Sequence, residues 1–365
     1  MFTQLTLASS DVGFSNVKTY ANQTDILFPS VVVPGRERVL ANTLSEEKGK
    51  AAVSSLLDKL HVVYQGREYY VGQLGSRNGG DYNWSVNRLN TLETKICFLT
   101  SIGLTMVKGE TDQQKFVVVT GLPIEHYRNP LLRQDYEHNL TGEHELTFVL
   151  PDGRTLSKRF FIVRLRVLPQ GLGCFYDVVF DDDGEVSRSD LLRKKHLLID
   201  VGFRTIDITT IEDFEPVDLY SYSLDNKGIK TVLDNTLEDI KSERREDGGL
   251  RFPEFVKPLA EMEQLFLDRT FFYDGQFHSV DPYSQKWLKE LAWEIENSVN
   301  TRLGGFSSYH NVFLSGGGAI GLFPYLSNPR VQLTPNSQFA NCHGFYKVAY
   351  RQLKDKLSQA GDARE

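Results

Sequence analysis

The chain has 365 residues, 40% of them hydrophobic and 24% charged, with a formal net charge of −7 at pH 7. This length favours two domains of about 150–200 residues each, and the acidic balance excludes general nucleic-acid adhesion, so we expect no direct DNA binding. The three cysteines, Cys97, Cys174 and Cys342, are odd in number and far apart, which argues against a disulfide framework or zinc cluster and for a cytoplasmic location. We also expect no signal peptide, because the N-terminus lacks a basic flank and a long apolar segment. No membrane contact is expected either, because no run of about 18 apolar residues occurs.

The first apolar runs predict strands at residues 5–9 and 26–33, with the turn Asp11-Val12-Gly13 close behind the first. Residues 34–80 are polar and mixed, which indicates an inserted small subdomain. Its predicted elements are a helix around residues 45–60 and strands at 62–64 and 68–71.

Apolar residues at steps of three or four predict a helix over residues 85–108. The β-branched run at 116–119 is typical of a strand buried on both faces. Pro151-Asp152-Gly153, between apolar runs at 145–150 and 159–168, predicts a hairpin. Residues 180–185 are interpreted as a linker, followed by a short helix at 190–195.

The second half repeats this plan. We expect strands at 197–200, 206–211 and 218–223, then a helix at 228–243. Residues 244–285 are polar and aromatic, which indicates a second small subdomain. A helix at 284–303 and a strand at 312–314 precede a glycine loop.

Two Asp-x-Gly turns follow apolar runs, one in each half: Asp11-Val12-Gly13 and Asp200-Val201-Gly202. A glycine two residues past an aspartate permits a tight turn that aims several N–H groups at one point, which suits phosphate oxygens. The aspartates can then hold Mg²⁺ through water. An isolated Asp-x-Gly is more often a plain hairpin turn, but its recurrence at Asp200 with the same flanking hydrophobicity favours phosphate binding.

The glycine loop Gly316-Gly317-Gly318 also fits the pattern Gly-x-Gly-x-x-Gly as far as Gly321. A dinucleotide site would need an acidic residue about 20 residues further on. None occurs between Gly321 and Asp355. The loop is therefore not interpreted as a dinucleotide site, and no P-loop motif is present.

Taken in order, these three motifs resemble the phosphate-1, phosphate-2 and adenosine motifs of the actin-like ATPases. Within that superfamily the chain most resembles the plasmid-segregation actins of the ParM type, with further likeness at residues 117–127, 167–170 and 339–345. The resemblance implies an α/β fold of two RNase H-like domains, each with a small inserted subdomain, and a nucleotide cleft between them. Domain I would be residues 1–190, with 34–80 as its subdomain and 337–365 returning to it. Domain II would be residues 191–336, with 244–285 as its subdomain.

The resemblance also assigns roles. Gln170, after Val-x-Pro, would orient the attacking water, and Asp11 and Asp200 would be catalytic and hold Mg²⁺ through water. The expected nucleotide-binding residues are Gly13, Phe14, Ser15, Asn16, Lys18, Gly202, Phe203, Thr205, Asp207, Gly228, Gly316, Gly317 and Gly318. Outside that family pattern, Lys18 would be an ordinary surface lysine, Asp207 a cap and Gln170 a loop residue.

The implied function is Mg²⁺-dependent hydrolysis of ATP, with GTP as a possible substitute, coupled to growth of a polar head-to-tail filament. The filament would segregate plasmid DNA through an adaptor protein bound to the plasmid centromere. Two alternatives stay open: another bacterial or archaeal actin-like cytoskeletal ATPase, used in cell division or positioning, and a non-polymerising sugar or metabolite kinase of the same superfamily. A division actin would carry a membrane-binding amphipathic tail, whereas residues 353–365 are mixed in charge. A kinase would need a catalytic aspartate base, for which no convincing motif is found.

Overall fold

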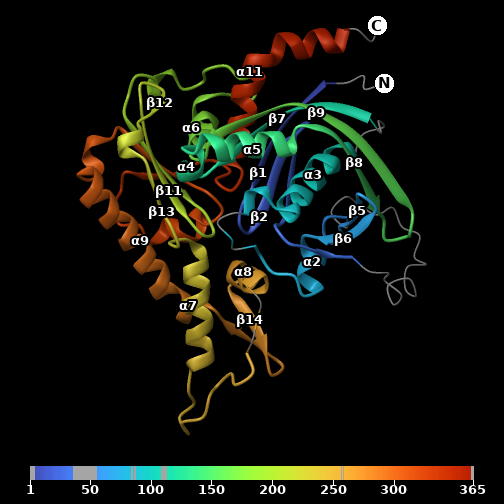
Figure 1. Ribbon diagram of the computed structural model, residues 1–365. Helices are drawn as coiled ribbons and strands as arrows, with labels where there is room; N and C mark the ends of the chain where they lie inside the picture. The colour runs from blue at the N-terminus through green and yellow to red at the C-terminus, as the bar shows by residue number, and fades with distance from the viewer. Residues whose placement is uncertain are drawn as a thin grey trace. The chain divides into compact units, whose positions relative to one another are not determined.

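The computed structural model describes residues 5–35, 56–83, 85, 88–107, 113–255, 257 and 259–362. The chain divides into two compact units, which are described separately (Figure 1). The first comprises Met1–Ser189 and Asn341–Glu365, and the second comprises Asp190–Ala340.

The first unit is built on one nine-stranded mixed sheet, in the order β3-β2-β1-β7-β9-β8-β5-β6-β4. Its strands are β1 (Leu5–Val12), β2 (Asn16–Ala21), β3 (Thr24–Pro29), β4 (Val32–Pro34), β5 (His61–Tyr64), β6 (Arg67–Val71), β7 (Gln113–Leu122), β8 (Gly142–Val149) and β9 (Thr155–Pro169). β1 and β2 form an antiparallel hairpin, whereas β1, β7 and β9 run parallel. The strands of the predicted 34–80 insertion continue this sheet through the pairing of β5 with β8.

The helices of this unit are α2 (Gln73–Arg77), α3 (Leu92–Val107), α4 (Ile124–Tyr127), α5 (Pro130–Leu140), α6 (Leu172–Val179) and α11 (Ala340–Asp362), with the 3₁₀ helix η2 (Arg88–Asn90). α3 packs against β1, β2 and β9. α5 begins where the sequence directs it, because Asn129 Oδ1 accepts hydrogen bonds from the N–H groups of Leu131 and Leu132 and Pro130 occupies the first turn.

The C-terminal helix α11 packs very closely against α6. A Cβ atom on Gly344 would overlap the carbonyl oxygen of Gly173, and one on Gly173 would lie 2.6 Å from the carbonyl oxygen of Asn341. Only glycines permit this approach. The packing places the start of α11 beside the ends of β7 and β9, since a Cβ on Gly121 would lie 2.7 Å from the Phe345 ring.

The second unit has a smaller sheet in the order β12-β11-β10-β16-β17, with β13 also pairing with β11. Its strands are β10 (His196–Val201), β11 (Ile206–Glu212), β12 (Glu215–Pro216), β13 (Tyr222–Leu224), β16 (Asn311–Ser315) and β17 (Val331–Leu333). The helices are α7 (Ile229–Ser242), α8 (Leu259–Asp268), α9 (Asp281–Leu303) and α10 (Ala319–Leu322), with the 3₁₀ helices η3 (Ser189–Leu191) at the junction of the units, η4 (Asp218–Tyr220), η5 (Phe306–Ser308) and η6 (Phe323–Tyr325).

Part of the second unit has a core of its own. The hairpin of β14 (Thr270–Tyr273) and β15 (Gln276–Ser279) is a separate two-stranded sheet. Phe252 and Phe255 pack on Phe271, with ring centroids 5.1 and 4.7 Å apart, and Ile240, Met262 and Val280 complete the cluster. Ile240 lies on α7 and Met262 on α8, and every residue of the cluster except Ile240 lies within the segment 244–285 predicted as a small subdomain.

Both units share one plan. In each, an antiparallel hairpin (β1–β2, β10–β11) is followed by a strand parallel to its first member (β7, β16) and by a further parallel strand (β9, β17). The predicted fold class, two α/β halves of one architecture, is confirmed by this topology.

Some predicted elements are wrong. Residues 218–223 are not one strand, because the 3₁₀ helix η4 occupies the first three positions and β13 begins only at Tyr222. The helix expected at 190–195 is absent, since η3 ends at Leu191, whose carbonyl accepts a hydrogen bond from the buried His196. The predicted helix at 45–60 lies largely outside the described residues. No helix in the described ranges is both long and apolar enough to cross a membrane.

Candidate functional site

The first Asp-x-Gly turn joins β1 to β2. Asp11 lies opposite Lys18 in the strand register, and the N–H of Gly13 donates to the carbonyl oxygen of Asn16 over 2.9 Å. A Cβ on Gly13 would lie 2.8 Å from that oxygen. The turn therefore closes so tightly that position 13 requires glycine.

The second Asp-x-Gly turn joins β10 to β11 with the same geometry. Asp200 lies opposite Asp207, the N–H of Gly202 donates to Thr205 O over 2.9 Å, and a Cβ on Gly202 would lie 2.7 Å from that oxygen. Both turns therefore connect the two strands of a hairpin, as the interpretation of Asp-x-Gly as a hairpin turn predicted. They are also two copies of one shape, each with a buried aspartate on the strand that enters it.

Three of the predicted residues meet at the first turn. Asp11 is buried, and its Oδ2 lies 3.7 Å from Lys18 Nζ. Its Oδ1 accepts a hydrogen bond of 2.8 Å from Nε2 of Gln170. Gln170 directly follows β9, and its N–H donates to Leu122 O at the end of β7. The fold therefore brings together residues 159 positions apart in the sequence.

The remaining predicted residues of this turn lie close by. Ser15 is buried, and its Oγ accepts a hydrogen bond of 3.0 Å from Asn16 Nδ2. The ring of Phe14 lies 4.2 Å from Cζ of Arg88. Cys342 Sγ donates to Lys18 O over 3.3 Å, and burial raises the pKa of this thiol well above its usual value, so it stays protonated.

Two residues that support the first turn were not predicted. Ser30 donates from its N–H to Ser15 O over 2.7 Å and from Oγ to Gly13 O over 2.8 Å. Arg88 donates from Nη2 to Val12 O over 2.6 Å. Neither belongs to a recognisable motif, because their contacts arise only when distant segments pack together.

A third unpredicted residue, Asn341, supports Gln170. Its Oδ1 accepts from the N–H of Gly171 over 3.0 Å and from Cys174 Sγ over 3.2 Å. Gly171 has φ of +85°, a conformation that favours glycine. Asn341 lies in the stretch 339–345 that supported the family resemblance. The sequence therefore drew attention to this segment, but it did not predict the contact between Asn341 and Gly171.

In the second unit, the Asp200 turn, the start of α7 and the glycine loop lie together. A Cβ on Gly316, which has φ of +95°, would overlap Asp200 Oδ1. The N–H of Gly318 donates to Val201 O over 3.0 Å. Gly228 caps α7 so closely that a Cβ would overlap Phe203 O, which also accepts from the N–H of Lys230 over 2.8 Å.

Gly317 differs from its two neighbours. It is exposed, and a Cβ there would meet nothing within 4 Å, whereas Gly316 and Gly318 are buried. The loop thus offers one backbone position to which a ligand can come close. Asp207 is buried and accepts a hydrogen bond from Ser223 Oγ, while Thr205 is half-buried.

The donor set suits a hydrated cation. Within the described ranges, no group of three or more His, Cys, Asp or Glu side chains gathers in a way that could hold a metal ion. Asp11 and Asp200 each offer one buried carboxylate from its own unit. Mg²⁺ keeps several waters and uses few carboxylates, so the chemistry of each carboxylate taken singly suits binding through water, and the shared site stays a prediction.

Comparisons with known proteins bear on both units. Residues 9–173 match the model of the N-terminal domain of actin like proteins, and residues 198–328 match that of the C-terminal domain of the archaeal actin homologue MreB-like proteins. No curated protein sequence matches the chain.

Solved structures of similar fold cover nearly the whole chain. A 15-stranded ParM filament from Clostridium botulinum is 24% identical, with a TM-score of 0.75 over 96% of this chain and 99% of that one. The apo pSK41 ParM protein is 19% identical, with a TM-score of 0.71 over 98% and 100%. The archaeal actin homologue Ta0583 in complex with ADP is 21% identical, with a TM-score of 0.70 over 94% and 99%.

Proposed function

Because this chain belongs to the actin-like proteins, we propose that it is a Mg²⁺-dependent ATPase that forms polar filaments in the cytoplasm and segregates plasmid DNA. The observation that carries the proposal is the pair of Asp-x-Gly turns with matching N–H···O distances of 2.9 Å at Gly13 and Gly202. The two units share one topology and each contains such a turn. In the first unit, Gln170 also donates a hydrogen bond to Asp11. Similar structures include a filament and an ADP complex.

In this proposal the turns bind the phosphates of one nucleotide through backbone N–H groups. The adenosine part would lie against Gly316, Gly317 and Gly318, near the start of α7 at Gly228. Mg²⁺, held through water by Asp11 and Asp200, would supply charge neutralisation at the phosphates. Lys18, already beside Asp11, would add a positive charge to the first turn.

Gln170 would orient the attacking water. Its Nε2 donates to Asp11, which fixes the amide so that Oε1 can accept a hydrogen bond from that water. A glutamine serves this role because the step needs a correctly placed polar group more than a strong base.

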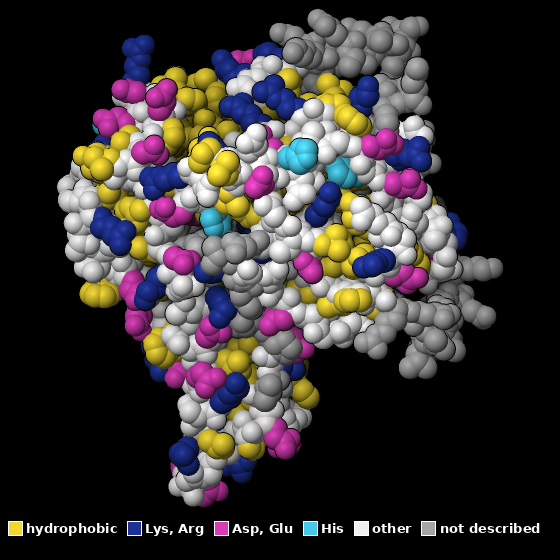
Figure 2. All heavy atoms as spheres, in the orientation of Figure 1, with side chains coloured by type: hydrophobic (Ala, Val, Ile, Leu, Met, Phe, Trp, Pro, Cys, Tyr) yellow, Lys and Arg dark blue, Asp and Glu magenta, His cyan; other side chains and the backbone are white. Residues whose placement is uncertain are grey.

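Filament growth would follow from nucleotide binding. A head-to-tail contact is heterologous and does not close into a ring, so it can extend indefinitely. Cargo would attach through an adaptor protein that binds both the filament and the plasmid centromere, because the acidic chain is not expected to bind DNA directly. On the face drawn in Figure 2, Lys and Arg side chains are interspersed with Asp and Glu side chains.

The experiment is phosphate release by the purified chain with ATP, and in parallel with GTP, in Mg²⁺ and in excess EDTA. We expect turnover only with the metal, and its loss in Asp200→Ala with the fold retained by circular dichroism. Equal turnover in EDTA, or an Asp200→Ala variant as active as the wild type, would contradict the proposal. Transfer of the γ-phosphoryl group to a small sugar or metabolite, which forms ADP without releasing phosphate, in the absence of assembly would favour the kinase alternative.

A further inference from the structure

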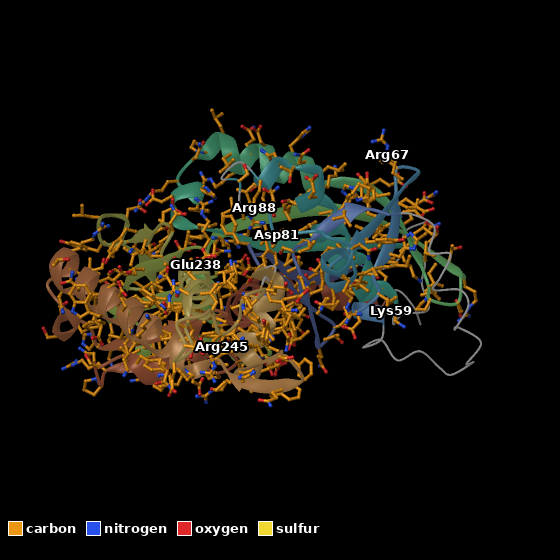
Figure 3. The ribbon with its side chains drawn as sticks, turned by 90° about the horizontal axis from the view of Figure 1, so that it is seen from below. Lys59, Arg67, Asp81, Arg88, Glu238 and Arg245 are labelled. Atoms are coloured by element: carbon orange, nitrogen blue, oxygen red, sulfur yellow. The ribbon has the colours of Figure 1, made fainter. Side chains whose placement is uncertain are left out.

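Arg88 is a buried arginine beside the first turn, and no sequence motif includes it. It lies in η2, just before α3, and only 7% of its surface is exposed. Figure 3 shows it within the first unit, whereas Arg67, on the β5–β6 hairpin, projects from the edge. Removing a guanidinium from water costs free energy unless partners compensate for it, so its position needs a physical reason.

The contacts of Arg88 hold both sides of Gly13. Nη2 donates to Val12 O over 2.6 Å, a short bond of the kind that a charged donor makes. Cζ lies 4.2 Å from the centre of the Phe14 ring, within the range of a cation–π interaction. One side chain thus fixes the residue before and the residue after the glycine of the turn.

The carbonyl groups of this turn are held by donors. Arg88 binds Val12 O, while Ser30 binds Gly13 O through Oγ and Ser15 O through its N–H. A carbonyl oxygen aimed at a phosphate would repel it, so binding these oxygens elsewhere favours an anion at the turn. Of the donor groups in these three bonds, only the guanidinium brings a positive charge.

That charge acts on the elements around it. Burial raises the pKa of Cys97 on α3 and of Tyr136 on α5 to about 12, and the positive charge of Arg88 opposes the rise in both. In a poorly hydrated interior a charge is weakly screened, so it is felt across several ångströms. An anion bound at the turn would lie in the same field.

We propose that Arg88 is a positioning residue of the first phosphate turn: it fixes the shape of the turn through Val12 and Phe14 and supplies a positive field that favours the terminal phosphates of a bound nucleotide. This inference rests on the proposed nucleotide binding by the same turn. We therefore expect that loss of the Arg88 charge weakens the binding of ADP more than that of AMP, because ADP carries more phosphate charge on which the field acts.

The test compares three variants by equilibrium binding of fluorescent ADP and AMP with Mg²⁺. Arg88→Gln keeps an N–H donor but removes the charge, and we expect ADP to bind about 10-fold more weakly while AMP changes less than about threefold. Arg88→Lys keeps the charge and should keep the ADP-to-AMP affinity ratio within about threefold of the wild type. Arg67→Gln makes the same charge change at an exposed position and should alter neither affinity.

Each outcome decides between a field effect and a merely structural role. If the ratio of ADP to AMP affinity is unchanged in Arg88→Gln, whether both ligands bind equally more weakly or neither does, the inference is overturned while nucleotide binding stays established. If Arg88→Gln does not fold, Arg88→Lys decides: ADP and AMP affinities that both stay within about threefold of the wild type support the role of charge, and a larger loss of both ligands despite the retained charge overturns it. If the wild-type chain binds no ADP, the proposed function fails and the inference fails with it.

Discussion

Gln170 donates a hydrogen bond of 2.8 Å from Nε2 to Oδ1 of Asp11, across 159 positions of sequence. The amide is held on the first turn by this bond and by the backbone bond from Gln170 to Leu122 O. If it orients water, Gln170→Ala should lower kcat for ATP hydrolysis by about 100-fold, the scale of one positioned group. The affinity for ADP should change little, and filaments should persist longer.

Steady-state phosphate release and ADP titration check this split between turnover and binding. The matched control is Gln276→Ala, at an exposed position on β15 in the second unit. Loss of ADP binding together with turnover in Gln170→Ala would mean that Gln170 maintains the turn and does not orient water.

The glycine loop allows a second prediction from two neighbouring residues. A Cβ on Gly318 would overlap the Ile229 side chain, so Gly318→Ala should destabilise the second unit by about 1–3 kcal/mol, the cost of overpacking. A Cβ on Gly317 meets nothing, so Gly317→Ala should unfold at the wild-type temperature. If the loop contacts adenosine, Gly317→Ala should nonetheless bind ATP more weakly. Thermal unfolding and ATP titration of both variants decide this, and an unchanged ATP affinity in Gly317→Ala would place the ligand elsewhere.

Buried His196 predicts a pH dependence of stability in the second unit. Burial lowers its pKa, and the neighbouring His310 and Lys194 act in the same direction, against the hydrogen bond to Leu191 O and the charge of Asp190. Because the folded-state pKa lies below the unfolded value of about 6.5, the unfolded chain binds more protons below that pH. The free energy of unfolding should therefore fall as the pH drops below about 6.5, by about 1.4 kcal/mol per unit of pKa difference, and stay level above it.

His196→Gln should weaken this dependence, as measured by urea unfolding at about pH 5.5 and pH 7.5. His138→Gln, at an exposed position on α5, is the control and should leave it unchanged. A wild-type chain that is equally stable at both pH values would contradict the argument.

The adaptor hypothesis makes a prediction about DNA. With a net charge of −7, the chain should retain duplex DNA only weakly at about 0.15 M salt, because few phosphates can be neutralised. Labelled duplex carrying the plasmid centromere should sediment with filaments only when the adaptor is added. Tight, sequence-selective retention by the chain alone would remove the need for an adaptor.

Local sequence signals predicted much of the fold and part of the candidate site. The helix expected at 228–243 is α7, capped by Gly228, because its apolar spacing and the glycine before it are both local features. The glycines of the two turns were identifiable for the same reason. The strand predicted at residues 218–223 was wrong because the local sequence does not reveal the hydrogen bonds of Ser221. Its Oγ donates to Val217 O and accepts from the N–H of Thr210, and these bonds hold the stretch in a turn beside β11.

The supporting residues could not be predicted. Arg88 reaches Val12 across 76 positions, and Asn341 reaches Gly171 across 170. Such contacts depend on how α3 and α11 pack against the rest of the unit. That packing depends on close approaches such as the one between Gly173 and Gly344, which no sequence motif predicts. Local propensity carries no information about these partners, so they appear only once the fold is known.

If nucleotide drives assembly of this chain, sedimentation of the purified protein should depend on nucleotide. Wild-type protein with Mg²⁺ and either ATP or a non-hydrolysable analogue should pellet as filaments visible by electron microscopy, and protein with no nucleotide or with EDTA should stay in the supernatant. Asp200→Ala, which loses one of the two proposed Mg²⁺ carboxylates, should fail to pellet under the same conditions. Pelleting that is equal with and without nucleotide, or none under any nucleotide, would contradict the account.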